Sequence, residues 1–257
     1  MPAIHPTSIV SKEAQIADDV VIGPFCIVEG DVKIDSGTKL LSHVVIYNGA
    51  RIGKNNKIFP GAVIAAVPQD LKFNNEYTEV FIGDNNTIRE AVTISRATAA
   101  TKKTVVGSNC LLMAYVHIAH DCVVGDNCIL ANSVQLAGHV HVEDYVIIGG
   151  LTGIHQFTTI GQHSMIGACS KIVKDIPPYT LFSGNPIMYE GLNRIGLKRR
   201  GFSSDAINSL KEAYNILYSP FYNTSQALEK IKAEVKQTQE VKNLLDFIEK
   251  SQRGISK

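Results

Sequence analysis

Aliphatic side chains recur at every sixth position from Ile4 to Ile172. Of the 29 positions in this phase, 26 are Ile, Val or Leu, and the exceptions are Asp70, Glu76 and Ala100. Neither the 3.6-residue period of a helix nor the two-residue alternation of a strand predicts so strict a period of six. A repeat this short and this persistent predicts a solenoid.

The same period predicts the shape of the solenoid. Three hexads would form one triangular coil, in which each hexad gives one short strand with its aliphatic residue pointing inward. Residues 18 apart would then stack at about 4.8 Å, the spacing of neighbouring strands. Small residues stand two positions before the aliphatic ones, and four of them are cysteines that we expect to be buried at tight corners: Cys26, Cys110, Cys122 and Cys128.

Two interruptions of the period predict loops that leave the solenoid. Residues 66–78 place Asp70 and Glu76 where aliphatic residues belong, and residues 95–103 are small and polar. Long loops inside a compact domain are commonly functional. We expect a function for the first loop because it carries Gln69, Asp70 and Lys72 together.

The period ends near residues 175–179, where two prolines follow one another. Apolar residues then recur at three- and four-residue spacing in segments 204–218, 224–236 and 239–252, which predicts three helices. We therefore expect a β-solenoid over residues 1–186 and an α-helical domain over residues 187–257. Such a domain would cap the solenoid and shield the open edge of its last coil.

Charge and hydropathy narrow the class of partner. The net charge is +1, which argues against nucleic acid, because phosphate binding usually leaves a clear basic excess. From Ile187 onward there are 12 Lys and Arg against 8 Asp and Glu, so an acidic partner would bind there. No apolar stretch reaches the ~20 residues of a membrane span, and the N-terminus lacks the pattern of a signal peptide, so we expect a cytoplasmic protein.

Six of the eight histidines lie between His117 and His163. The stack of coils places His120, Gly138 and Gln156 in one column. It places His139 in the column on one side, and His155 in the column on the other side. The arithmetic of the coil therefore predicts a patch in which His120, His139 and His155 surround a glycine.

This patch suggests acid–base chemistry. A histidine is the usual general base near neutral pH, and Asp121 could orient the ring of His120. The backbone N–H of Gly138 could stabilise an oxyanion, since no side chain blocks it. No Ser or Cys stands out as a nucleophile, so direct transfer to an acceptor hydroxyl deprotonated by His120 is the simplest scheme. Zinc bound by histidines, or a binding solenoid without catalysis, would also fit the spacing.

Several motifs, taken together and in this order, closely resemble the UDP-N-acetylglucosamine O-acyltransferases that open lipid A biosynthesis. The resemblance extends over the whole chain. Its most specific segments are residues 68–72, 117–125, 136–139, 147–150, 155–157 and 190–202.

The resemblance implies a left-handed parallel β-helix with a C-terminal α-helical domain, assembled as a homotrimer with active sites between subunits. It implies transfer of an (R)-3-hydroxyacyl chain from acyl carrier protein to the 3-hydroxyl of UDP-N-acetylglucosamine, with no cofactor and no metal. Acyl carrier protein is acidic, which suits the basic tail.

The resemblance also implies a role for each matching residue. His120 would be the general base, Asp121 its partner and Gly138 the oxyanion donor. The residues expected to bind substrate are Gln69, Asp70, Lys72, His117, His139, His155 and Gln156, with Asn193, Arg199 and Arg200 at the nucleotide. Ala168 stands at the position that sets acyl-chain length, and Ile195 replaces a glutamate that some relatives use near the nucleotide.

Two other enzymes share parts of this pattern. The N-acyltransferase that acts later in the same pathway carries a domain before its β-helix, whereas here the period starts at Ile4. A zinc carbonic-anhydrase-like solenoid would hold one metal between histidines of two subunits. The position of Asp121 beside His120 favours the base–carboxylate pair over that zinc site.

Overall fold

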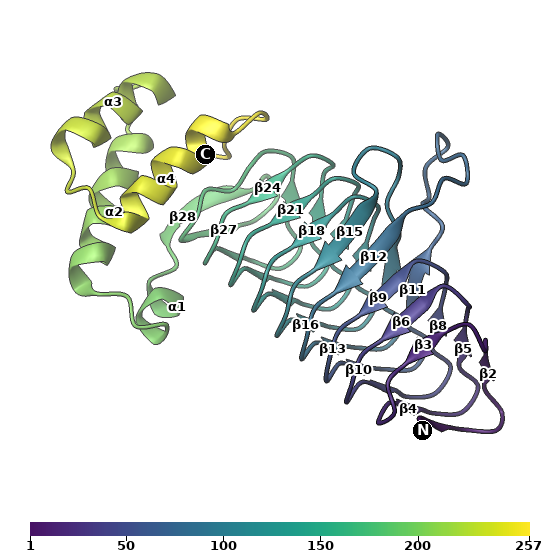
Figure 1. Cartoon of the computed structure of the whole chain (residues 1–257). Helices are drawn as coiled ribbons and strands as arrows, with labels where there is room; N and C mark the ends of the chain where they lie inside the picture. Colours follow the sequence, from purple (N-terminus) through teal and green to yellow (C-terminus); the bar gives the residue numbers. More distant parts are fainter.

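The computed structural model describes all 257 residues, and most of them form a parallel β-helix with a triangular cross-section (Figure 1). The first sheet has 11 strands, of which all but the last pair in parallel. They are β1 (Ala3–Ile4), β4 (Val21–Ile22), β7 (Lys39–Leu40), β10 (Lys57–Ile58), β13 (Thr87–Ile88), β16 (Leu111–Leu112), β19 (Ile129–Leu130), β22 (Ile147–Ile148), β25 (Met165–Ile166), β27 (Thr180–Ser183) and β28 (Met188–Leu192).

The second and third sheets, of nine and eight parallel strands, form the other two sides. The second consists of β2 (Ile9–Val10), β5 (Ile27–Val28), β8 (Val45–Ile46), β11 (Val63–Ala66), β14 (Thr93–Ser95), β17 (His117–Ile118), β20 (Gln135–Leu136), β23 (Gly153–Ile154) and β26 (Lys171–Ile172). The third consists of β3 (Gln15–Ile16), β6 (Val32–Ile34), β9 (Ala50–Ile52), β12 (Glu79–Ile82), β15 (Lys103–Val106), β18 (Val123–Val124), β21 (His141–Val142) and β24 (Thr159–Ile160).

The strand register confirms the predicted coil of three hexads. Leu111 pairs with Ile129, for example, and the inward aliphatic side chains form one buried cluster of 42 residues. The four cysteines of the small-residue phase are free and buried, as expected. Tight corners also explain the recurring glycines: a Cβ on Gly107 would lie 2.7 Å from the backbone carbonyl of Gly125 on the next coil. The core therefore consists of stacked aliphatic ladders.

Both predicted loops leave the β-helix at the same corner, the one between the second and third sheets. The first loop, residues 66–78, joins β11 to β12, and the second, residues 95–103, joins β14 to β15. Arg51 pairs with Phe81, and Phe81 pairs in turn with Val105, so the first loop lengthens its coil by two hexads and the second by one. Because both insertions are whole hexads, the aliphatic ladder keeps its phase on either side of them.

Three of the four helices match the predicted segments: α2 (Ser204–Leu217), α3 (Thr224–Glu234) and α4 (Gln239–Lys250). Helix α1 (Arg194–Arg199), which contains the basic residues Lys198 and Arg199, was not predicted from the sequence, nor were strands β27 and β28 beyond the last regular coil. These two strands pair antiparallel, so the expected domain boundary after residue 186 lies in the turn that connects them. None of the helices combines the length and the hydropathy that crossing a bilayer requires.

The helices pack on the end of the β-helix around a second core of 16 buried residues (Figure 1). Tyr189 and Tyr218 contact both cores. The C-terminal segment also covers the last coil, since Asp175 N–H donates to the carbonyl of Gly254 at 3.0 Å and the Asp175 carbonyl accepts from Ser256 N–H at 2.8 Å. The helical cap and the shielded edge predicted from the sequence are therefore present.

Candidate functional site

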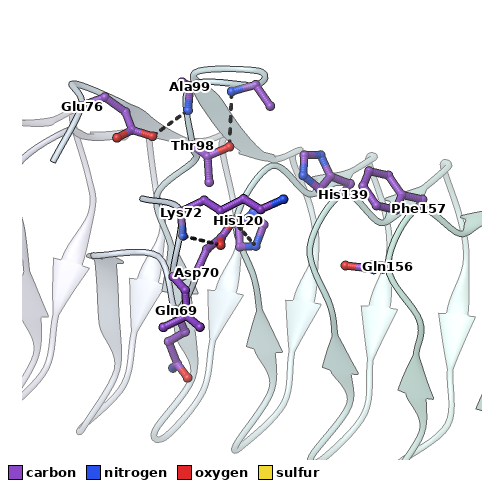
Figure 2. Close-up of a pocket in the computed structure, with 12 residues that line it drawn as sticks. Gln69, Asp70, Lys72, Glu76, Thr98, Ala99, His120, His139, Gln156 and Phe157 are labelled. Carbon is purple, nitrogen blue, oxygen red and sulfur yellow. Dashed lines mark hydrogen bonds and ion pairs between the residues drawn. The ribbon is translucent and has the colours of Figure 1, made fainter. Parts of the chain in front are cut away.

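A cleft of about 730 Å³ lies at the corner where both loops leave the β-helix (Figure 2). The loops form one side, and turns of three successive coils form the other. Its lining residues are Gln69, Asp70, Leu71, Lys72, Glu76, Thr98, Ala99, Ala100, His120, His139, Gln156 and Phe157. The first loop and the predicted histidine column thus meet at one site, although Asp70 and His120 are far apart in the sequence.

His120 and Asp121 form a hydrogen-bonded pair at the centre of the cleft. His120 Nδ1 lies 2.8 Å from Asp121 Oδ2, whose side chain is fully buried. His120 Nε2 lies 4.0 Å from Asp70 Oδ2 of the first loop. Figure 2 shows Asp70 and Lys72 extending from that loop beside the His120 ring. A carboxylate at Nδ1 fixes the tautomer that leaves Nε2 free to accept a proton on the cleft side.

The second loop holds the carboxylate of Asp121. Thr98 donates its N–H at 3.2 Å and its hydroxyl at 2.8 Å, and Thr101 donates its N–H at 3.2 Å together with its hydroxyl. Burial alone would raise the pKa of Asp121, but the hydrogen bonds from Thr101, His120 and Thr98 together keep that pKa below its ordinary value. Asp121 is therefore an ionised, fixed acceptor for the His120 ring at neutral pH.

Gly138 lies directly beneath His120, as the stack of coils predicts. A Cβ on Gly138 would lie 2.5 Å from His120 Cε1 and 2.7 Å from Nε2, closer than real contacts allow. Gly138 is buried, and its backbone N–H donates to no atom of the chain. This position can hold only glycine while His120 keeps its place, and it leaves one backbone donor beside the base.

His139 lies beside His120, in the neighbouring column, as predicted. Its ring stacks on Phe157 with centroids 4.5 Å apart and meets His120 edge-on at 5.3 Å. His139 Nε2 lies 3.7 Å from Asp121 Oδ2. The side chains of His139 and Gln156 both reach the cleft.

His155 is not part of this cleft, so the prediction of one patch around Gly138 is wrong for that residue. His155 and His117 line a second, mostly apolar groove of about 420 Å³ over β20, β23 and β26. His117 Nδ1 lies 2.7 Å from the hydroxyl of Thr93, and burial, with a smaller effect of the charge on His120, lowers the pKa of His117. Side chains on the two sides of a sharp corner point to different faces, which a column count alone does not resolve.

Four other expected site residues line neither the cleft nor the groove. Asn193 caps α1 by accepting the N–H of Gly196, and the guanidinium of Arg200 lies over the ring of Tyr145, 5.2 Å from its centroid. Arg199 and Ala168 are exposed. A single chain therefore does not bring these residues to the His120 cleft.

Thr98, Thr101 and Glu76 are functional candidates that were not predicted from the sequence. The small, polar second loop carried no predicted role, yet it supplies most of the hydrogen bonds to Asp121. The 18-residue period did contain a signal for the position of this loop. The second loop follows β14, and β14 pairs with β17, the strand just before His120, so the loop had to emerge next to that histidine.

His120, Asp121 and His139 also form the one cluster in the chain that could hold a metal ion, with ligand atoms within 4.8 Å of one another. Zinc would require these atoms about 2 Å from a shared centre. The oxygens of Asp121 already accept hydrogen bonds from Thr98, Thr101 and His120. The donor set therefore fits a base held by a carboxylate better than it fits a metal site.

Comparisons with known proteins agree with this geometry. Residues 175–256 match a family described as UDP-N-acetylglucosamine O-acyltransferase, domain 2, and residues 13–48 and 103–138 match the bacterial transferase hexapeptide repeat. The chain is 51% identical over 256 residues to the acyl-[acyl-carrier-protein]–UDP-N-acetylglucosamine O-acyltransferase of Thermodesulfovibrio yellowstonii, covering 99% of both chains. It is 46% identical to the enzyme of that name from Thiobacillus denitrificans, again over 99% of both.

A solved structure of a UDP-N-acetylglucosamine acyltransferase from Bacteroides fragilis superposes with a TM-score of 0.97 at 46% identity, covering 99% of this chain and all of that one. The hexapeptide repeats and this likeness identify the fold as a left-handed parallel β-helix with a C-terminal helical region. Identity at this level over the full length shows the family. The chain belongs to the acyl-[acyl-carrier-protein]–UDP-N-acetylglucosamine O-acyltransferases.

Proposed function

We propose that this protein transfers an (R)-3-hydroxyacyl group from acyl carrier protein to the glucosamine 3-hydroxyl of UDP-N-acetylglucosamine, the first step of lipid A biosynthesis. Family membership supports the reaction class and both substrates. The observation that carries the mechanism is the His120–Asp121 pair, with Nδ1 on the carboxylate at 2.8 Å and Nε2 on the cleft side. That arrangement suits a general base, and direct transfer needs no protein nucleophile.

In this scheme His120 Nε2 removes the proton of the sugar 3-hydroxyl as its oxygen attacks the thioester carbonyl carbon. A C–O bond forms, and the carbonyl oxygen becomes an oxyanion. This oxyanion accepts a hydrogen bond from the backbone N–H of Gly138, which has no other acceptor in the chain. The intermediate then collapses with cleavage of the C–S bond. The proton on His120 passes to the departing thiolate of the carrier, so that His120 ends the cycle neutral.

The remaining site residues would orient the two substrates. Asp70 and Lys72 extend into the cleft beside His120 (Figure 2) and would bind hydroxyl groups of the sugar or of the acyl chain. Gln69, His139 and Gln156 line the same cleft. His117 and His155 border the apolar groove, whose composition suits a hydrocarbon chain.

A homotrimer would account for the residues that one chain leaves outside the cleft. Arg199 and Arg200 are proposed to bind the nucleotide phosphates, as arginine geometry favours, together with Asn193. If active sites form between subunits, these residues and Ala168 could complete a cleft on a neighbouring chain. We further propose that the protein is cytoplasmic, and that acidic acyl carrier protein docks near the basic C-terminal part.

The central test is acyl transfer by purified protein, measured with 3-hydroxyacyl carrier protein and UDP-N-acetylglucosamine. Replacing the base, His120→Ala, should lower kcat by about 10²–10⁴-fold, the usual contribution of general acid–base catalysis. His141→Ala, an exposed histidine outside both hollows, serves as the matched control. A His120→Ala enzyme with near-normal turnover would refute the general-base assignment. Donors of different chain lengths, with Ala168→Gly beside the wild type, would locate the limit of the acyl groove.

The zinc alternative is tested in the same preparation, because His120, Asp121 and His139 could in principle share an ion. Metal analysis and assay after chelation distinguish the two mechanisms. Activity that survives complete removal of metal supports the base mechanism. Activity lost with the metal and restored by zinc would replace it with metal-assisted chemistry.

A further inference from the structure

The second excursion loop, residues 95–103, is held between two carboxylates. Every backbone N–H from Thr98 to Lys102 has an acceptor. Those of Thr98 and Thr101 bind Asp121, that of Ala99 binds Glu76 Oε1 at 2.9 Å, and that of Ala100 binds the Thr98 hydroxyl. The N–H of Lys102 closes the turn on the carbonyl of Thr98 at 2.9 Å. The loop is therefore anchored on the catalytic side by Asp121 and on the opposite side by Glu76.

Glu76 belongs to the first excursion loop, so its contact with Ala99 joins the two loops (Figure 2). Its other oxygen accepts the N–H of Asn74 at 2.7 Å, which fixes the carboxylate on its own loop. Backbone N–H groups, first its own and then those of Asn74 and Ala99, and the nearby charge of Arg96 keep the pKa of Glu76 below its ordinary value. Glu76 is thus an ionised acceptor at neutral pH, and hydrogen bonds to charged acceptors are the stronger kind.

Two more contacts hold the loops together. The N–H of Arg96 donates to the carbonyl of Ala66 at 2.9 Å, and its guanidinium lies 5.5 Å from the ring centroid of Phe73. These contacts anchor the base of the second loop. Its tip, which carries Thr98 and Thr101, is hydrogen-bonded to the first loop only through Glu76.

We propose that Glu76 is a positioning residue for the reaction proposed above, on which this inference rests. It holds the tip of the second loop so that Thr98 and Thr101 keep the Asp121 carboxylate aimed at His120 Nδ1. The chain of contacts runs from Glu76 through Ala99 and Thr98 to Asp121, without touching the reacting atoms. Glu76 therefore acts on kcat through Asp121 and has little effect on substrate affinity.

A double-mutant cycle between Glu76 and Asp121 tests this route. Glu76→Ala is expected to lower kcat about tenfold, the value of one hydrogen bond to a charged group, with KM for UDP-N-acetylglucosamine changed less than about twofold. In the Asp121→Asn background, Glu76→Ala should cause no further loss. Glu90→Ala removes a solvent-accessible carboxylate from another corner and is the matched control.

Opposite results would overturn the proposal. A rise in KM at unchanged kcat would mean that Glu76 binds substrate directly, as its place on the cleft wall would allow. Losses that multiply in the double variant would show that Glu76 and Asp121 act independently.

Amide hydrogen exchange tests the same contact without any assay. In Glu76→Ala, exchange at residues 98–102 should increase, while exchange in the β-strands stays as in the wild type. Unchanged exchange in that segment would refute the anchoring role. If the wild type transfers no acyl group, the proposed function fails, and exchange still decides whether Glu76 holds the loop.

Discussion

The cleft at His120 and the groove at His155 lie on two faces of the same coils, yet their chemistry differs. In the cleft, a histidine is paired with a buried carboxylate at 2.8 Å, and two loops supply polar groups around it. In the groove, the side chain of His117 bonds only to the hydroxyl of Thr93 at 2.7 Å, and half of the ten lining residues are aliphatic. His117 and His120 are nevertheless close neighbours on one coil.

The difference comes from the corner and from the loops that leave it. Residues before the corner project from the second sheet into a groove that no residue of either loop lines. Residues in the corner face the loops, which bring Asp70 to one side of His120 and, through Thr98, fix Asp121 on the other. His120 is a candidate base because the loops hold the carboxylate of Asp121 against its ring. His117, three positions earlier, has no such carboxylate.

Apart from removal of the His120 side chain itself, the largest effect should follow from displacing the His120 ring. In Gly138→Ala the new methyl group would lie 2.5 Å from His120 Cε1, so the ring must shift. A displacement of about 1 Å can cost 10²-fold in rate, so kcat should fall by about that factor while the fold is kept. Steady-state kinetics measure the change in kcat, and thermal unfolding checks that the fold is kept.

Gly30→Ala is the matched control for this variant, because a Cβ there would come closer than 3.0 Å only to the side-chain end of the exposed Glu13, on a coil near the N-terminus. It should unfold at the wild-type temperature and leave His120 undisturbed. Wild-type kcat in Gly138→Ala would mean that the close contact with His120 has no catalytic importance.

A smaller effect is expected from His117→Ala in the groove. Because His117 has no carboxylate partner and is proposed to bind substrate, its loss should raise KM by about tenfold, the worth of one hydrogen bond, and leave kcat nearly unchanged. The comparison with His120→Ala is made in one assay. A loss of kcat as large as that of His120→Ala would erase the distinction between cleft and groove.

The last effect, on stability and not on rate, concerns a third histidine without a hydrogen-bonded carboxylate. Burial, with the charge of Arg200, lowers the pKa of His163 to about 4 from an ordinary value of 6.5. Since the folded-state pKa lies below the unfolded one, this contribution to stability is complete above pH 6.5 and is lost as pH falls towards 4. Allowing for solvent screening, the loss should be about 1–2 kcal/mol.

His163→Phe keeps an aromatic ring between Tyr145 and Tyr179, on which His163 stacks with centroids 4.7 and 5.8 Å away. Urea unfolding of this variant should show a flatter pH dependence between pH 6.5 and 4 than the wild type. If the unfolding free energy of both proteins changed equally with pH, His163 would not be the source of the acid sensitivity.

Much of the fold could be predicted because each part depends on local pattern. The period of six gave the coil and the position of Gly138 beneath His120. Helical spacing gave α2, α3 and α4 within a few residues. Short α1 and the β27–β28 hairpin lie outside any regular repeat, and no periodic signal marks them.

The sequence by itself determined the β-helix, its register and the column that contains His120, because a stacked repeat turns residue number into position. Only the tertiary structure decided which face of the corner each histidine occupies, and that His155 lies in the groove. It also decided what holds Asp121, because loop residues outside the repeat follow no ladder. Thr98, Thr101 and Glu76 reach their places through hydrogen bonds between separate loops, and such contacts leave no period in the sequence.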